Sequence, residues 1–211
     1  MANLSASRLV ALADEIAVHA KNGSHWSKDR YDLERFERIL TLATEILGET
    51  LHHDPADVAR WYTDEPGTFT AKVGASVAAF DADGRLLMIQ RRDNACWAMP
   101  GGIVEYGETV AEAAEREAWE EAGVEVRVHA LLGIYETRRH GAQTIHRWQH
   151  ISFLADVIRG TPGPSDETLA AGFFTEAEIA SLTISPGHDD LIRDAFAAYR
   201  SGNIAAFFDM P

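Results

Sequence analysis

Three glutamates within five residues form the part of the chain that is best suited to chemistry. Glu117, Glu120 and Glu121 lie in a run of helix-forming residues. With about 100° of rotation per helical residue, they fall within about one quadrant of the helix surface. Carboxylates on one face repel each other, but a hard divalent cation between them makes the arrangement favourable. Oxygen ligands on a rigid element suit Mg²⁺ or Mn²⁺, so the spacing indicates a metal site.

The helix that carries these glutamates has sequence signals at both ends. Thr109 is a good N-cap, and Glu112 completes a capping box three residues later. Gly123 suits the left-handed residue that ends a helix. A stripe of small residues beside the acidic face lets the helix axis approach its neighbour closely: Ala111, Ala114, Ala118 and Ala122. We therefore expect a helix between Thr109 and Gly123.

A solvated acidic face is the plainer interpretation, because Arg116 could pair with Glu112 or Glu120 at a spacing of four residues. The wider pattern argues against it. A glycine, a glutamate, an Arg-Glu-apolar run, a Glu-Glu pair and a Gly-apolar pair stand at fixed spacings: Gly102, Glu108, Arg116–Ala118, Glu120–Glu121 and Gly123–Val124. This pattern resembles the signature of the Nudix hydrolase family, without departure.

The resemblance implies that Glu117, Glu120 and Glu121 bind Mg²⁺, for which Mn²⁺ can substitute. It also implies that the carbonyl of Gly102 adds a ligand, since glycine lets the backbone come close. Arg116 would orient these carboxylates by contacting them rather than the metal. Hydrolysis of a diphosphate needs charge neutralisation, a polarised phosphorus and an aligned water. These residues are therefore the expected catalytic centre.

Two further acids are assigned by their positions. Glu108 comes just before the helix cap, and we expect it to brace the loop rather than to bind metal. The base that activates the water varies within the family, and it is either a glutamate of the helix or a loop residue. Glu167, in the loop 164–168, is our candidate outside the helix. An ordinary surface acid is an equally good interpretation of Glu167.

Three arginines are candidates for binding the phosphates of a substrate. Arg91 and Arg92 end a predicted strand, and adjacent strand residues face opposite sides. One of them is therefore expected to reach a phosphate, with a surface salt bridge as the alternative. Arg138 lies in the polar loop 137–146, which could close over a phosphate or simply be solvated.

Aromatic side chains offer a surface for a nucleobase. Trp97 is the candidate that follows the arginine pair, and Tyr135 and Trp148 are two others. Large aromatic side chains are more often core residues, so both interpretations stay open.

Composition limits the class of protein. The chain has 211 residues, 46% apolar and 25% charged, which fits one domain of about 150 residues and an appendage. The net charge of −14 argues against nucleic acid as a partner, although a bound cation would allow small phosphate substrates. No apolar run approaches the ~20 residues of a membrane span, and acids within residues 1–16 argue against a signal peptide. Cys96 is the single cysteine, which excludes an intrachain disulfide and favours a cytoplasmic protein.

Apolar periodicity predicts helices over residues 4–21 and 29–50, which would form an αα-hairpin within residues 1–66. The second helix carries an apolar seam of Leu33, Phe36, Leu40, Ala43 and Leu47, widened by Ile39 and Ile46. A hairpin of this size cannot bury such a seam well by itself. We therefore expect it to pack on the catalytic domain or on a second copy of itself in a homodimer.

From residue 72 the period changes to that of strands. They are predicted over 73–80, 85–91, 125–136, 147–158 and 169–174, and Ser185-Pro186 starts a last helix. This order fits the α/β/α sandwich with a mixed sheet that the Nudix resemblance implies for residues 67–211. Three stretches near the N-terminal region are similar to the ADP-ribose or CDP-choline pyrophosphatase subgroup: Tyr31-Asp32-Leu33, Glu65-Pro66-Gly67 and Lys72-Val73.

The sequence thus predicts a metal-dependent hydrolase that cleaves the pyrophosphate of a small nucleotide-type substrate by water attack. ADP-ribose is the first candidate and CDP-choline the second. The alternative is a Nudix-fold sensor that binds such a ligand without cleaving it. Sensors usually lose carboxylates of the signature, and all are intact here. A structural helical adaptor would leave the signature unexplained, and neither nucleic acid nor a membrane is an expected partner.

Overall fold

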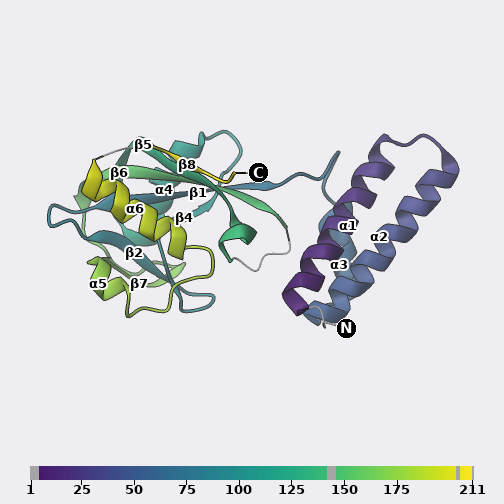
Figure 1. The fold of residues 1–211 in the computed structure, drawn as a ribbon, viewed down its shortest axis with the longest axis horizontal. Helices are drawn as coiled ribbons and strands as arrows, with labels where there is room; N and C mark the ends of the chain where they lie inside the picture. The colour runs from purple at the N-terminus through teal and green to yellow at the C-terminus, as the bar shows by residue number, and fades with distance from the viewer. Residues whose placement is uncertain (1–4, 142–145, 203–204, 211) are drawn as a thin grey trace. The chain divides into compact units, whose positions relative to one another are not determined.

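A computed structural model describes residues 5–141, 146–202 and 205–210 (Figure 1). Contacts between residues divide the chain into two compact units, residues 1–71 and residues 72–211. That residues 1–66 and residues 67–211 are separate domains, one helical and one catalytic, stays a prediction.

The first unit is helical. It consists of α1 (Ala6–Trp26), α2 (Arg30–Leu51) and α3 (Pro55–Thr63). The side chains of Ser5 and Asp29 cap α1 and α2, and the two helices form the predicted hairpin. Only two helices were predicted here. The third begins with Asp54 as N-cap and Pro55 in the first turn, a pair of residues typical of a helix start.

Small residues hold α1 against α2. Ala13 and Ala17 of α1 and Ala43 of α2 are buried in one apolar cluster. The first helix is longer than the predicted range 4–21, because α1 continues through Gly23 to Trp26. A Cβ on Gly23 would lie 2.5 Å from the ring of Phe36, so this glycine serves close packing of the helices rather than a helix end.

The second unit is built on one mixed sheet. Its strands are β1 (Lys72–Phe80), β2 (Leu86–Arg91), β3 (Trp97–Ala98), β4 (Gly101–Ile103), β5 (Val124–Glu136), β6 (Trp148–Gly160), β7 (Thr168–Phe174) and β8 (Phe207–Phe208). The main order is β3-β2-β1-β6-β5-β8, with β4 paired to β1 and β7 paired to β2. β1 runs parallel to β6 and β5 parallel to β8, whereas the other pairs are antiparallel. The predicted mixed sheet is confirmed.

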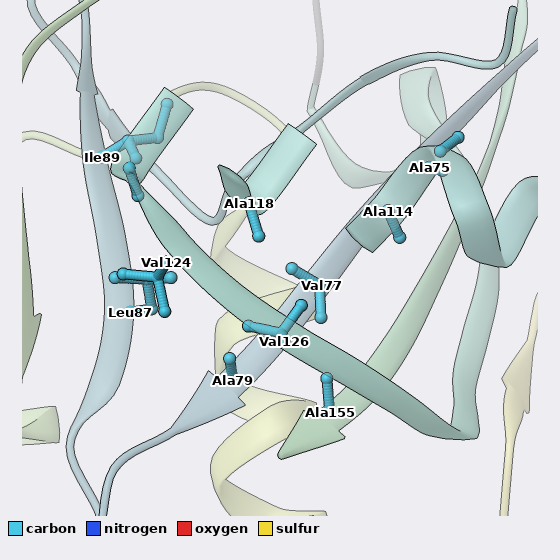
Figure 2. Close-up of a cluster of buried hydrophobic side chains, with 12 residues drawn as sticks. Ala75, Val77, Ala79, Leu87, Ile89, Ala114, Ala118, Val124, Val126 and Ala155 are labelled. Atoms are coloured by element: carbon cyan, nitrogen blue, oxygen red, sulfur yellow. The ribbon is translucent and has the colours of Figure 1, made fainter. Parts of the chain in front are cut away.

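Helices cover both faces of this sheet. They are α4 (Val110–Ala122) and α6 (Asp189–Ser201), with the shorter α5 (Glu176–Ile179) and the 3₁₀ turn η1 (Thr137–His140). Figure 2 shows Ala114 and Ala118 of α4 above Val77 and Val126 of the sheet, within one buried cluster. A second cluster packs α6 on the opposite face. In the part of the chain that the structure describes, no helix has the length and apolarity that a membrane crossing needs.

The last helix starts later than predicted. Ser185 was expected to be its N-cap, but the backbone N–H of Ser185 donates to the carbonyl of Trp97 at 2.8 Å. This bond ties the segment to β3, and α6 begins at Asp189, after His188. Gly202 ends α6 in the left-handed conformation. Of the predicted loop 137–146, residues 142–145 lie outside the described residues.

Candidate active site

Both ends of α4 are fixed as the sequence predicts. The Thr109 side chain accepts the N–H of Glu112, and the Glu112 side chain accepts the N–H of Thr109, which completes the capping box. Gly123 ends the helix with a φ of 70°. The buried small residues differ by one from the predicted stripe, since Ala111 stays partly exposed and the buried set is Ala113, Ala114, Ala118 and Ala122.

Glu117 lies against the backbone of β4. Its side chain is only 9% exposed. A Cβ added to Gly102 would collide with the Glu117 carboxylate and lie 2.7 Å from its Cδ, so only glycine leaves room for this carboxylate. Burial raises the pKa of the Glu117 carboxyl, and the nearby Arg116 guanidinium opposes the rise. The charges of Glu120 and Glu167 add to the raised pKa.

Arg116 ties several carboxylates together. Its Nη1 donates to Glu117 Oε1 at 2.9 Å and to Glu120 Oε2 at 2.8 Å. Its Nε and Nη2 donate to the two Glu108 oxygens at 3.1 and 2.9 Å. Glu108 also accepts the N–H of Glu105 at 2.7 Å. Glu108 therefore connects the loop before α4 to Arg116, which is the position expected of a brace.

Glu121 is buried on the same side of α4. It is 6% exposed, and its Oε2 accepts the N–H of Gly101 at 2.8 Å. Burial raises the pKa of the Glu121 carboxyl to about 7, against the effect of the Gly101 hydrogen bond. The charge of Glu117 raises this pKa further. A cation beside the two buried carboxylates would offset both the burial and the repulsion.

The loop before β7 brings a fourth acid to this centre. The hydroxyl of Thr168 donates to the carbonyl of Glu121 at 2.8 Å, which anchors the start of β7 to α4. Glu167 immediately precedes Thr168, and its charge contributes to the raised pKa of both Glu117 and Glu121. The predicted candidate for the base therefore lies within electrostatic range of the helix glutamates.

The two adjacent arginines have different surroundings. Arg91 forms two hydrogen bonds with Asp93, at 3.0 and 2.8 Å. Its charge also opposes the raised pKa of Glu121, so Arg91 is the one near the carboxylates. Arg92 instead donates to three main-chain carbonyls of the loop 165–168. This gives the guanidinium of Arg92 a structural role in holding the loop.

Two of the three aromatic candidates, Trp97 and Tyr135, pack against core residues, whereas Trp148 is a half-buried residue at the start of β6. The ring centroid of Trp97 lies 4.9 Å from that of Phe174 in an edge arrangement, and Trp97 contacts the buried cluster on the α6 face. Tyr135 is fully buried and donates to Asp194 at 3.2 Å. Both positions fit the core interpretation. Arg138 lies in η1, and its contact with substrate stays a prediction.

The donor set of this centre suits a hard divalent cation. Carboxylate and carbonyl oxygens are the ligands that Mg²⁺ takes, and the absent side chain of Gly102 makes the space that the Glu117 carboxylate fills. Among the described residues, no three His, Cys, Asp or Glu side chains already converge as metal ligands. Glu117 and Glu120 point to Arg116 instead. Cation binding would therefore turn these side chains, with the backbone already in place.

Glu121 gives a pH prediction for the metal-free protein. Its pKa is about 7 in the folded chain, against an ordinary value of 4.5, so the folded state holds this proton more tightly. The contribution is most favourable below pH 4.5, falls as pH rises to 7, and changes by about 3 kcal/mol over this window. Urea unfolding in EDTA should show Glu121→Gln gaining stability over wild type as pH rises. A stability difference that does not change with pH would contradict the buried carboxyl.

Two residues extend the centre beyond the predicted set. Gly101 donates its N–H to Glu121, and Thr168 anchors the loop that carries Glu167. The glycine pair 101–102 was a sequence signal from which the role of Gly101 could have been predicted. The role of Thr168 depends on a contact between distant parts of the chain, for which the local sequence carries no signal.

Comparison with known proteins agrees with this arrangement. The NUDIX domain family matches residues 70–195, and a family described as a UDP-X-like, N-terminal oligomerisation domain matches residues 7–62. Protein YjhB of Bacillus subtilis (strain 168) is 28% identical over 173 residues, which cover 81% of this chain and 82% of that protein. The ADP-ribose pyrophosphatase of Methanocaldococcus jannaschii is 37% identical over 119 residues, or 54% of this chain and 67% of that protein.

A solved structure gives the same fold over nearly the whole chain. The crystal structure of a UDP-X diphosphatase has a TM-score of 0.59 and 21% sequence identity, and the match covers 98% of this chain and 100% of that one. The sequence signature, the sandwich fold and a NUDIX domain match over more than half of the residues lead to one conclusion. The chain belongs to the Nudix hydrolase family.

Proposed function

We propose that this chain hydrolyses the diphosphate of a nucleoside diphosphate that is linked to another group, with ADP-ribose as its preferred substrate. The observation that carries the proposal is the group of acids around the Gly101–Gly102 backbone: Glu117, Glu120, Glu121 and Glu167. The complete set of signature carboxylates favours a hydrolase over a sensor. The choice of ADP-ribose rests on the similarity to the Methanocaldococcus jannaschii pyrophosphatase.

Each residue has a task in this proposal. A bound Mg²⁺, or Mn²⁺ in its place, would neutralise the diphosphate and polarise the attacked phosphorus. The residues that would hold it are Glu117, Glu120, Glu121 and the carbonyl of Gly102. Arg116 positions Glu117 and Glu120 through its Nη1. Glu167 would accept the proton of the attacking water, because it is the acid of this group that comes from a separate loop.

A substrate screen tests the proposed preference. Purified protein with Mg²⁺ would be incubated with ADP-ribose, CDP-choline, a UDP-sugar, NADH and 8-oxo-dGTP, and nucleotide release would be followed. We expect the highest kcat/KM with ADP-ribose, which would yield AMP and ribose 5-phosphate. A higher kcat/KM for CDP-choline or for the UDP-sugar would overturn the choice of ADP-ribose while leaving the reaction type in place.

We also infer that the helical unit joins two copies of the chain. Of the predicted seam, Ala43 and Leu47 are buried within the unit itself. Three other apolar residues of α2 share one exposed stripe, with 39%, 42% and 38% of their surface accessible: Ile39, Leu42 and Ile46. An exposed apolar stripe on a small helical unit is typical of an oligomer contact. The matching family is described as an N-terminal oligomerisation domain, which supports the same proposal.

Charge on this stripe should separate the copies. We expect Ile39→Asp/Ile46→Asp protein to sediment as a monomer and the wild type as a dimer, because two desolvated carboxylates in an apolar contact are unfavourable. Thr41→Asp, on another exposed part of α2, serves as the matched control and should remain dimeric. A wild-type monomer, or an unchanged dimer in the double variant, would refute this interface.

A further inference from the structure

A short edge strand holds residues 205–210, here called the β8 segment, on the second unit. β8 pairs with β5 through two residues, Gly133 and Ile134 (Figure 1). A Cβ on Gly133 would lie 2.9 Å from the Cβ of Phe207, so the missing side chain leaves room for this strand. The Phe207 ring stacks on that of Tyr135, with the centroids 4.8 Å apart. A pairing of two residues is only marginally stable by itself, so side-chain contacts are needed to keep the β8 segment in place.

A histidine between two aspartates supplies such contacts. The side chain of His140, the last residue of η1, is only 8% exposed. Its Nδ1 lies 2.7 Å from Asp190 Oδ2 in the first turn of α6, and its Nε2 lies 3.1 Å from Asp209 Oδ1 in the β8 segment. We call these three residues the histidine clamp. The clamp connects η1 to α6 on one side of the ring and to the β8 segment on the other.

Two further hydrogen bonds join the β8 segment to the same turn. Asp209 Oδ2 accepts the N–H of Glu136 at 2.7 Å, where β5 passes into η1. Arg139 of η1 donates from Nη1 to the carbonyl of Met210 at 2.6 Å. The β8 segment therefore also holds the turn that carries Arg138, the candidate phosphate ligand.

The two contacts of the ring require a charged histidine. An ionised carboxylate only accepts hydrogen bonds, whereas a neutral imidazole offers one donor and one acceptor. His140 can therefore donate to both aspartates only as an imidazolium. Its hydrogen bond lowers the pKa of the Asp190 carboxyl, which keeps this partner ionised. A neutral ring would turn a lone pair towards one carboxylate, and the longer contact, to Asp209, is the one expected to be lost.

The other titratable and charged groups around the clamp come from several elements. On α6, Arg193 pairs with Asp190 and donates to Asp194 at 3.2 Å. On β5, the Tyr135 hydroxyl also donates to Asp194, and its ring centroid lies 5.2 Å from that of His140. Asp190 thus has a second, permanently charged partner, whereas histidine is the side chain of this group that changes charge between about pH 5 and 8. The remaining groups lie on β5 and η1: Glu136, Arg138 and Arg139.

We propose that the histidine clamp is a pH-sensitive fastening, which holds the β8 segment and η1 on the sheet while His140 is protonated and loosens them when the ring is neutral. The fastening is a property of the fold and is independent of the reaction. Its consequence for substrate binding, through Arg138, rests on the proposed function.

Hydrogen exchange of the Glu136 N–H, measured by NMR on the full chain, tests the clamp because Asp209 accepts this N–H. The protection factor corrects for the intrinsic pH dependence of exchange and reports local opening. We expect it to fall about tenfold in wild type between about pH 6 and about pH 9, as the loss of one charged hydrogen bond predicts. His140→Gln, whose side chain does not titrate, should give the same low protection at both pH values. His129→Gln, at an exposed position on β5, is the matched control and should behave as wild type.

Equal protection of the Glu136 N–H at both pH values in wild type would overturn the proposal, as would wild-type pH dependence in His140→Gln. Should His140→Gln not fold, the ¹⁵N signals of the His140 ring in wild type decide. We expect both ring nitrogens to be protonated at the lower pH and the protection to fall as one proton is lost. Loss of that proton with unchanged protection would refute the clamp.

Steady-state kinetics with ADP-ribose test the consequence for substrate. We expect the KM of His140→Gln to exceed that of wild type at the lower pH and to equal it at the higher pH, because wild type is then loosened too. The kcat should differ little, since Arg138 would bind substrate rather than the reacting atoms. Equal KM values at both pH values would overturn the link to Arg138. Intact ADP-ribose with pH-dependent Glu136 protection would reject the proposed hydrolysis and keep the clamp.

Discussion

Glu120→Gln and Glu121→Gln are each expected to lower turnover by about 100-fold or more while leaving the protein folded. Glutamine keeps the size of the side chain and removes the charge that would hold a divalent cation. The loss of one electrostatic stabiliser of a transition state has an effect of this order. Folding should not suffer, because Glu121 is buried with a raised pKa and a neutral amide can still accept the N–H of Gly101.

The control for these variants is Glu115→Gln on the same helix. Glu115 accepts the N–H of Val128 at 2.8 Å, on a different side of α4, and glutamine can keep this bond. Its turnover should stay within about twofold of wild type. Turnover within a few-fold of wild type in both Glu120→Gln and Glu121→Gln would remove these residues from the proposed centre.

Gly102→Ala should give the second large effect. The added Cβ would collide with the Glu117 carboxylate, and this side chain must then move. The carboxylate is the far end of a flexible side chain, so the chain should still fold. A catalytic group displaced by about 1 Å costs about 100-fold in rate. Steady-state kinetics should therefore show a loss of that order in kcat, with a melting temperature close to wild type.

A second glycine separates this effect from a general glycine-to-alanine effect. Gly163 has open space around its added Cβ, and Gly163→Ala should keep wild-type kinetics. Adding Glu117→Gln to the Gly102→Ala variant should lower kcat only a little further, because the Glu117 carboxylate is already misplaced in that variant. Full activity of Gly102→Ala would show that the close contact with Glu117 has no catalytic consequence.

Local signals explain what the sequence could predict. The capping box of Thr109 and Glu112 and the left-handed Gly123 are encoded within a few residues, and the structure has both. The spacing of Glu117, Glu120 and Glu121 follows from helical rotation alone. Strand periodicity likewise predicted most of the sheet. These features depend on backbone geometry that neighbouring residues determine.

Contacts between distant segments explain what the sequence could not predict. Ser185 carries a good cap sequence, but its backbone bonds to Trp97 and the helix starts later. Arg91 and Arg92 are adjacent in the sequence, and only the hydrogen bonds of Arg92 to carbonyls of a loop more than seventy residues away distinguish their surroundings. Gly23 looks like a helix end, and the ring of Phe36 explains why it is not. In each case a tertiary contact competes with a local signal.

Residue roles in catalysis and the cytoplasmic location stay predictions.

Incubation of wild-type protein with ADP-ribose in ¹⁸O-water, with Mg²⁺ or with EDTA, tests the central claim most directly. With Mg²⁺ we expect AMP and ribose 5-phosphate, with the label on the phosphate of one of them, because water attacks one phosphorus of the diphosphate. EDTA should abolish the reaction, since several acids would otherwise repel the substrate. Intact ADP-ribose with Mg²⁺ and with Mn²⁺, together with tight binding by calorimetry, would contradict the account and identify a sensor.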